Sequence, residues 1–336
     1  MFSRLDSVAV HKAASFAAQR VPRRLAGYAV DAGAWGAALL AGDRRLIVER
    51  NLERATETAG QGSVSQAAIA RSFATYGRYY LDSFRLPGLS AAEIDDGFRY
   101  TGYEHISTAI ESGTSPILVL PHLGGWEWAA FWLTKVKGLS VTAVVEPLEP
   151  PELFDWFRSF RESLGMEVIG VGPSAGSEIA ASLARGSIVC LLSDRVVADA
   201  SAVPVTFFDE RTLLPAGPAA LALRTGAPLL PVAVYFDGDM HVAEVRPPVD
   251  TSRTGPFRDD VARVTQQVAD EFERFIRAAP DQWHVLQPGW PSDFRALGRR
   301  VPERFEALGG GVSVGGAGSA GVVRRDGGVS AGSADK

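Results

Sequence analysis

The chain contains a single cysteine, Cys190, among its 336 residues. One cysteine excludes an internal disulfide and any metal site built from several cysteines, and it suits a reducing compartment. Because Cys190 lies within an apolar run at 188–192, we expect it to be packed in a core. The histidines other than His122 have no metal-like spacing, so the sequence predicts no metal site.

The chain also lacks an excess of positive charge. Its formal net charge of -5 and its pI of about 5.6 argue against a nucleic-acid-binding protein, since no basic field dominates the chain. We therefore expect small molecules, lipids or proteins as partners. A hydrophobic content of 46% over this length is enough to bury a sizeable core, in one large domain or in two closely packed ones.

No long uninterrupted apolar run is present. The most apolar early stretch, 25–42, contains Asp31 and three glycines, so it is a poor match to the span of about 20 residues that a bilayer requires. No secretory signal is apparent either, and we expect the mature chain to begin near Met1. Arginines flank the stretch: Arg20, Arg23, Arg24, Arg44 and Arg45. This pattern fits a helix lying on an anionic membrane surface, and it also fits a solvated helix end beside an ordinary core.

The sequence pattern changes near residue 100. Before it, apolar residues recur at three- and four-residue spacing, for example Ile69, Phe73, Tyr76 and Tyr80, which predicts helices. After it, short apolar runs at 117–120, 141–145, 168–171 and 188–192 alternate with helical segments around 126–136, 151–164 and 177–184. This alternation predicts βαβ units, and hence an α/β fold with a mainly parallel central sheet flanked by helices.

Further elements follow this alternating region. Two β-like runs, 203–208 and 229–236, flank a helix near 219–224, and 240–245 is predicted to pair antiparallel with the second run. Helical spacing returns over 259–278. We therefore predict an N-terminal helical, membrane-associating region (1–100), packed with an α/β domain (101–308). A disordered Gly/Ser/Ala-rich tail (309–336) follows them.

Polar side chains follow each of the four apolar runs. His122 comes after the first run, Glu146 after the second, the 172–174 turn after the third, and Asp194 with Arg195 after the fourth. Each residue alone is explained by a cap or a turn. Ligands bind beyond the carboxyl ends of strands in open α/β sheets, so the shared edge of the sheet predicts a functional site.

His122 and Glu127 are the central pair at this edge. Histidine has an unperturbed pKa near neutrality, and a carboxylate can hold its ring and stabilise the imidazolium, so the pair indicates a general base that activates a hydroxyl. Residues five apart on a continuous helix diverge by roughly 140°. The two can converge only if the chain turns at Gly124 and Gly125. A carboxylate in the first turn of a helix is also favoured by the helix dipole, which explains Glu127 without any chemistry.

The spacing from His122 to Glu127 resembles the His-x4-Asp/Glu signature of glycerolipid acyltransferases. The surrounding sequence is similar to one branch, the lipid A acyltransferases and the actinobacterial phosphatidylinositol mannoside acyltransferases, and fits the second of these better. Similar segments occur in the expected order: 72–80, 84–87, 160–165, 193–195, 203–208, 215–220, 225–227, 231–232 and 282–287.

The resemblance implies transfer of a long-chain acyl group, usually palmitoyl, from acyl-CoA or acyl carrier protein to a sugar hydroxyl, with a mannose of phosphatidylinositol mannoside as acceptor. Acyl-CoA is then a co-substrate, and no cofactor is expected. By motif position His122 is the general base, Glu127 orients it, and Asp194 is a second acidic residue that shares this role. The residues leave open which carboxylate contacts the imidazole.

The resemblance also implies binding residues. Glu146 and Arg161 are expected to line the acceptor or thioester pocket. Arg161 and Arg195 are expected either to contact phosphate or to form surface salt bridges. Backbone N–H groups around Gly124 and Gly125, at a helix start, are expected to receive the developing oxyanion.

Membrane placement follows from the amphiphilic substrates. The resemblance implies a peripheral protein on the cytoplasmic face of the cell (inner) membrane, with the N-terminal helical region as the contact. An aromatic run is expected either to line an acyl tunnel or to form core: Trp126, Trp128, Phe131 and Trp132.

Two other functions compete with acyl transfer. The segment 172–176 matches the G-x-S-x-G pattern that follows a strand in serine hydrolases, with Ser174 as nucleophile. The remaining triad members would come from Asp237 or Asp239 and from His241 or His284. The third alternative is a non-catalytic lipid-binding protein, although a carrier has no need of a base such as His122.

Overall fold

The computed structural model describes residues 4–56, 64–146, 150–197 and 200–309. Its body is a seven-stranded sheet with the strand order β1-β9-β8-β2-β5-β3-β4. The strands are β1 (Phe98–Thr101), β2 (Ile117–Leu120), β3 (Val141–Val145), β4 (Met166–Gly170), β5 (Ile188–Leu192), β8 (Leu229–Asp237) and β9 (Met240–Val245). The five strands from β8 to β4 run parallel, and β9 pairs antiparallel with β8 as predicted. The α/β fold predicted from the alternating pattern is confirmed.

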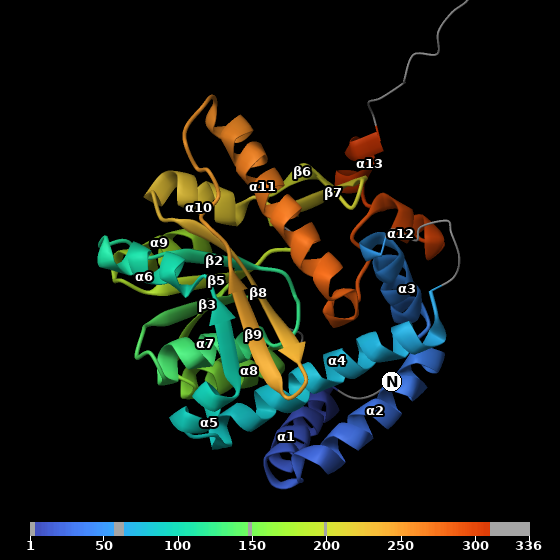
Figure 1. Cartoon of the computed structure of the whole chain (residues 1–336). Helices are drawn as coiled ribbons and strands as arrows, with labels where there is room; N and C mark the ends of the chain where they lie inside the picture. Colours follow the sequence, from blue (N-terminus) through green and yellow to red (C-terminus); the bar gives the residue numbers. More distant parts are fainter. Residues whose placement is uncertain (1–3, 57–63, 147–149, 198–199, 310–336) are drawn as a thin grey trace, which may run out of the picture.

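Helices cover both faces of the sheet (Figure 1). One face carries α9 (Ala175–Ala184), α10 (Gly217–Thr225) and α11 (Phe257–Ala278); the other carries α5 (Ala91–Asp96), α6 (Tyr103–Glu111), α7 (Trp126–Lys135) and α8 (Pro151–Ser163). Successive strand residues point to opposite faces. Ile117 accordingly packs in the core under α9 to α11, and Leu118 packs in the core under α7. Burial on both faces explains why these strands are continuous apolar runs.

The N-terminal helices lie side by side against the body. They are α1 (Arg4–Arg20), α2 (Arg23–Leu40), α3 (Asp43–Ala55) and α4 (Gln66–Arg85), and α4 packs against α1 and α2. The predicted helical periodicity is confirmed at Ile69 and Phe73, which are buried in this packing. Ser65 begins α4 by accepting a hydrogen bond from the backbone N–H of Ala68.

The sequence patterns did not predict two of the strands, β1 and β7. The edge strand β1 buries only Phe98 of its four residues, so it has no apolar alternation. The strand β7 (Glu210–Pro215) begins with two charged residues and pairs antiparallel with β6 (Ala202–Phe207) in a separate two-stranded sheet. The predicted run 203–208 ends one residue early because Phe208 and Asp209 adopt positive φ angles of 52° and 58° at the turn.

The chain after α11 folds back across the molecule. A short helix, α12 (Pro291–Ala296), and α13 (Glu303–Glu306) follow the extended segment around residue 283. The predicted tail at 309–336 lies outside the described residues from 310 onwards. The boundary at residue 100 stays a prediction.

Candidate active site

A tight turn after β2 positions the central residues. Gly124 has a φ of +55°, and a Cβ atom there would lie 1.9 Å from the carbonyl oxygen of Val234. A Cβ atom on Gly125 would lie 2.6 Å from Cδ2 of His241. Only glycine fits the first position, since both the backbone conformation and the space exclude a side chain. The turn packs against β8 and β9, and α7 begins directly after it.

A late segment of the chain holds this turn in place. The carbonyl of Gln282 accepts a hydrogen bond from the Gly124 N–H at 3.0 Å, and the His284 N–H donates to the carbonyl of His122 at 2.8 Å. Leu123 and Trp283 face each other in this short antiparallel contact. Backbone hydrogen bonds therefore fix the loop from both sides of Leu123.

His122 is bound by Asp194. The two residues follow β2 and β5, which are neighbours in the sheet. Nδ1 of His122 lies 2.5 Å from Oδ1 of Asp194, and the His122 backbone N–H donates to Oδ2 at 2.9 Å. An Nδ1–H donating to the carboxylate leaves the lone pair on Nε2. The His122 side chain is 25% exposed and that of Asp194 is fully buried, so the pair presents a base to solvent and hides its partner.

Asp194 has the charge that this arrangement requires. Burial alone would raise its pKa, but the imidazole of His122 and the hydrogen bonds from His122 and Trp283 hold the pKa below its usual value. The carboxylate is therefore anionic near neutral pH. It can stabilise an imidazolium that forms when Nε2 takes a proton.

Glu127 lies elsewhere. Its carboxylate accepts hydrogen bonds from Tyr79 at 2.8 Å, Ser83 at 3.0 Å and Arg161 at 2.7 Å. No hydrogen bond between the described residues joins it to His122. The expectation that Glu127 orients the imidazole is therefore not met in this structure, because α7 carries the side chain towards α4 and α8. Asp194 occupies that place instead.

Arg161 is also used internally. Its guanidinium is buried against Glu127 and lies 5.3 Å from the ring centre of Trp126. Burial, followed by the charge of Glu127, raises the pKa of the neighbouring Tyr79 well above its ordinary value, so this phenol stays protonated. Because the guanidinium of Arg161 is buried and paired with Glu127, it is not placed to contact phosphate. This corrects the binding role expected for Arg161.

Arg195 and Glu146 remain at the rim. They follow the adjacent strands β5 and β3, form an ion pair at 2.5 Å, and are both partly exposed. Their pairing matches the salt-bridge alternative for Arg195. Because the pair is accessible, it can also exchange partners with a charged ligand.

The two glycines differ as candidate oxyanion donors. The N–H of Gly124 is taken by the Gln282 carbonyl, which removes it from the expected set. Gly125 precedes α7 as its N-cap residue, and no backbone hydrogen bond between described residues uses its N–H. The N–H groups of a helix start favour negative charge, so Gly125 is the one of the two glycines whose N–H stays a candidate donor.

The aromatic run on α7 forms core. Its members are all buried in the cluster between the sheet, α5 and α6: Trp126, Trp128, Phe131 and Trp132. The indole N–H of Trp128 donates to the carbonyl of Ile94, and that of Trp132 donates to Asp95. Such fixed, internally bonded rings favour the core interpretation over the tunnel.

Ser174 is far from every candidate base. It follows β4 at the end of the sheet, three strands from β2 and five from β9, so it lies about 14 Å from the His122 position and about 24 Å from the His241 position at a strand spacing near 4.8 Å. Its φ of -86° shows no strain of the kind a nucleophile elbow requires. A serine hydrolase site is not assembled. Within the described ranges no three His, Cys, Asp or Glu side chains gather as metal ligands either.

Several site residues were missed by residue-level reasoning. Trp283 donates its indole N–H to Asp194 at 2.8 Å, and His284 lies beside His122. Burial, then the charge of His122, lowers the pKa of His284 to about 3, so it is neutral. The sequence offers His284 only as a triad histidine of a hydrolase. Trp283 is covered only by the family resemblance of 282–287, because an aromatic residue after a long helix gives no chemical signal of its own.

Comparisons with known proteins identify the relatives of this chain. The sequence model of the family described as bacterial lipid A biosynthesis acyltransferase matches residues 9–292. A phosphatidylinositol mannoside acyltransferase of Mycolicibacterium smegmatis is 37% identical over 279 residues, which cover 81% of this chain and 88% of that protein. A protein of the same name from Mycobacterium tuberculosis is 37% identical over 241 residues, covering 69% of this chain and 72% of that protein.

Proposed function

The chain belongs to the bacterial lipid A biosynthesis acyltransferase family, and from this premise we propose that it transfers a palmitoyl group from acyl-CoA to a mannose hydroxyl of phosphatidylinositol mannoside. The names of the relatives support the acceptor. The observation that carries the chemistry is the His122–Asp194 pair, in which a buried carboxylate holds Nδ1 of a partly exposed imidazole.

The mechanism is general-base catalysis. Nε2 of His122 takes the proton of the mannose hydroxyl as its oxygen attacks the thioester carbonyl carbon. The resulting tetrahedral intermediate collapses, the C–S bond breaks, and the imidazolium returns the proton to the leaving thiolate. Asp194 stabilises the imidazolium between these steps. The overall products are the O-acyl ester and free CoA, and no cofactor is needed.

Two further groups complete the proposed site. The Gly125 N–H at the start of α7 stabilises the oxyanion. Arg195 releases Glu146 to contact a phosphate of the donor or the acceptor, since this ion pair is partly exposed and at the same sheet edge. A bound phosphate then replaces Glu146 as the anionic partner.

We also propose that the protein lies on the cytoplasmic face of the cell membrane through α2. None of the described helices is long and apolar enough to span a bilayer. Yet α2 exposes large apolar side chains, ending with Leu40. Four of them recur at helical spacing along one side, a set we call the α2 stripe: Leu25, Tyr28, Trp35 and Leu39. The exposed cations Arg24 and Arg44 lie at its two ends, so the surface suits the interface of an anionic bilayer.

The reaction is tested with purified protein, palmitoyl-CoA and mannosylated phosphatidylinositol, by following CoA release and the acylated lipid by mass spectrometry. Wild type is expected to form both products. His122→Ala is expected to lose activity about 1,000-fold, whereas Ser174→Ala keeps it.

Each other outcome points to a different function. CoA release that depends on Ser174 and gives no acylated lipid would support a hydrolase. Neither product would support a lipid-binding protein. Parallel reactions with palmitoyl-acyl carrier protein in place of palmitoyl-CoA show which of the two acyl donors the protein uses.

Membrane contact is tested by flotation with vesicles of phosphatidylglycerol and phosphatidylethanolamine. Changing Tyr28, Trp35 and Leu39 together to serine is expected to leave the protein unbound. The control is Tyr100→Ser, which removes an exposed aromatic ring from β1, outside the stripe. Equal flotation of both variants and wild type would contradict this placement, as would continued flotation after deletion of residues 1–45.

A further inference from the structure

Trp283 touches the buried side of the His122–Asp194 pair but has no part in the reaction as written. Its ring is 3% exposed, and its indole N–H donates to Oδ2 of Asp194 at 2.8 Å. Oδ2 also accepts the His122 backbone N–H, and Oδ1 accepts the imidazole N–H. Among the described residues, the three donors to this carboxylate come from His122 and Trp283.

We propose that Trp283 is a positioning residue for acyl transfer, acting through Asp194 by fixing the plane of its carboxylate and limiting how strongly it holds the imidazolium. This inference rests on the proposed function. Asp194 can turn about its Cβ–Cγ bond, and the indole N–H resists that turn because a charge-assisted hydrogen bond has a preferred direction. The same hydrogen bond stabilises negative charge on Oδ2, so the carboxylate attracts the imidazole of His122 less strongly.

Trp283 is well held for this role. Its indole packs against Phe207, Phe208 and Trp290, with ring centres 6.1, 5.5 and 6.2 Å away. Its backbone faces Leu123 in the turn that carries His122. The ring is therefore fixed by its aromatic neighbours and joined through its backbone to the loop that carries His122.

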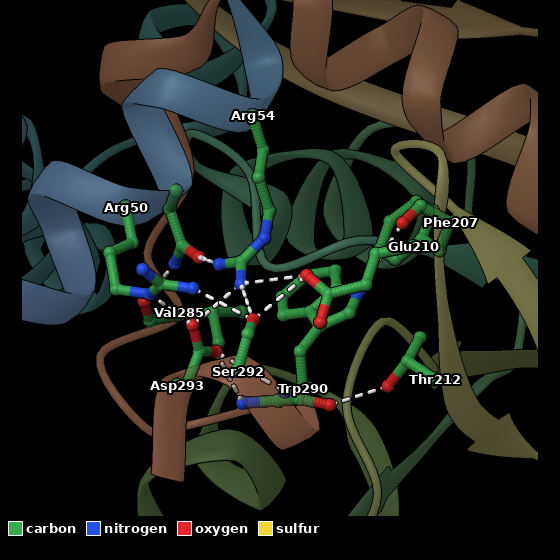
Figure 2. Close-up of polar contacts among 11 residues, drawn as sticks. Arg50, Arg54, Phe207, Glu210, Thr212, Val285, Trp290, Ser292 and Asp293 are labelled. Atoms are coloured by element: carbon green, nitrogen blue, oxygen red, sulfur yellow. Dashed lines mark hydrogen bonds and ion pairs between the residues drawn. The ribbon is translucent and has the colours of Figure 1, made fainter. Parts of the chain in front are cut away.

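The next layer is an ion-pair cluster around Trp290 (Figure 2). The guanidinium of Arg54 lies 4.0 Å from the ring centre of Trp290 and pairs with the fully buried Asp293 at 2.6 Å. Arg50 pairs with the same carboxylate at 2.7 Å. The indole N–H of Trp290 donates to the carbonyl of Phe207, away from Asp194. Trp290 thus shares the packing of Trp283 without its contact with the carboxylate.

The ionisable neighbours of the pair do not obscure this effect. His284, on the same segment as Trp283, has its pKa lowered to about 3 by burial and then by the charge of His122, and stays neutral over the pH range of an assay. Arg195 follows Asp194 in the chain and is paired with Glu146. On α7, Glu127 is paired with Arg161. Arg195 and Glu127 are therefore each held in an internal ion pair.

The experiment compares Trp283→Phe with Trp290→Phe in the full chain. Both changes remove one indole N–H from a nearly equally buried ring of the same aromatic cluster, with exposures of 3% and 2%. Only the first removes a donor from Asp194. The pH profile of kcat/KM, with kcat and KM measured separately for palmitoyl-CoA and the mannosylated acceptor, is the main readout.

Trp283→Phe is expected to move the acid limb of this profile upward by roughly half a pH unit, because the freed carboxylate holds the imidazolium more tightly. Its kcat at the optimum is expected to fall about tenfold, with both KM values unchanged. Trp290→Phe is expected to keep the wild-type acid limb. A Trp283→Phe profile that is uniformly lower, with the acid limb in the wild-type position, would overturn the proposal and leave Trp283 as a packing residue.

A second readout does not depend on substrate. The imidazole of His122, labelled with carbon-13 and assigned by its loss in His122→Ala, is titrated by NMR in wild type and both variants. Titration at higher pH only in Trp283→Phe supports the proposal, and identical curves overturn it. If wild type transfers no acyl group, the proposed function fails while this titration still tests Trp283.

If Trp283→Phe does not fold, the proposal is tested on the wild-type protein, with the Trp283 indole as the probe. The Trp283 indole N–H resonance, assigned through its proximity to Leu123, is expected to shift as His122 titrates. A resonance that stays fixed through that titration would also overturn the proposal.

Discussion

The His122–Asp194 pair and the Glu127–Arg161 pair lie at the two ends of one turn, yet they are built for different tasks. Both join a basic group to a buried carboxylate, at 2.5 Å and 2.7 Å. The first basic group is an imidazole, which can gain and lose a proton, and its side chain is partly exposed. The second is a permanent cation enclosed by α4, α7 and α8. Chemistry requires the first arrangement, and anchoring a helix requires only the second.

The largest expected effect comes from breaking the first pair. Asp194→Asn should lower kcat/KM by roughly 100- to 10,000-fold, because the amide loses the charge that stabilises the imidazolium and presents N–H groups to the donors of His122 and Trp283. The reaction with palmitoyl-CoA measures it, and thermal unfolding checks that the fold remains. A decrease in kcat/KM of less than tenfold would contradict the view that Asp194 serves the chemistry and Glu127 serves stability.

Glu127→Gln should act on stability. It leaves the buried Arg161 without its counter-charge, which is expected to cost about 3 kcal/mol of the free energy of unfolding. Urea unfolding measures this cost. Activity per folded molecule should fall much less than in Asp194→Asn. A variant that keeps wild-type stability but loses activity would show instead that Glu127 serves the chemistry.

Replacing both Glu127 and Arg161 tests whether the two side chains stabilise the fold as a pair. Glu127→Gln combined with Arg161→Met should be more stable than Glu127→Gln alone by about 1–2 kcal/mol, because no unpaired buried charge remains. Urea unfolding of the two single variants and the double variant gives the coupling. Additive losses would mean that the two side chains do not act as a pair.

A smaller effect is expected from one donor to Glu127. Ser83→Ala removes a buried hydroxyl that donates to this carboxylate at 3.0 Å and should cost about 1 kcal/mol of stability, with activity retained. Ser163→Ala is the control, since its exposed hydroxyl bonds only within α8, and it should change stability by less than about 0.5 kcal/mol. Equal effects in the two variants would contradict the buried network.

The last prediction concerns pH. Burial, then the charge of His122, lowers the pKa of His284 to about 3 in the folded chain, whereas the unfolded chain binds this proton near pH 6.5. The contribution of His284 to stability is therefore complete above pH 6.5 and declines as the pH falls towards 3, by less than about 1.4 kcal/mol per pH unit.

Urea unfolding at several pH values measures this decline. His284→Gln should flatten part of it. The remainder includes His241, whose pKa is lowered by burial and then by Arg78 and Arg23. If the free energy of unfolding of His284→Gln depends on pH as steeply as that of the wild type, burial of His284 beside His122 carries no pH-dependent cost in stability.

The sequence was sufficient for the parallel core of the sheet and for the placement of His122 at its edge. Apolar runs buried on both faces marked β2, β3 and β5 at their observed bounds, and the parallel order brought His122 and Asp194 to one edge. It could not decide which carboxylate meets the imidazole. That choice depends on the direction of α7 after Gly125 and on the indole of Trp283, both set by contacts between residues far apart in the chain.

Those contacts also impose an order on synthesis. A nascent chain that has emerged through β5 already contains His122 and Asp194, but the segment 282–284 that fixes their loop is still to be made. The α2 stripe has left the ribosome long before. Under the function proposed above, the chain can therefore reach a lipid surface while the loop of His122 is still unfixed, and acyl transfer has to wait until nearly the whole polypeptide is present.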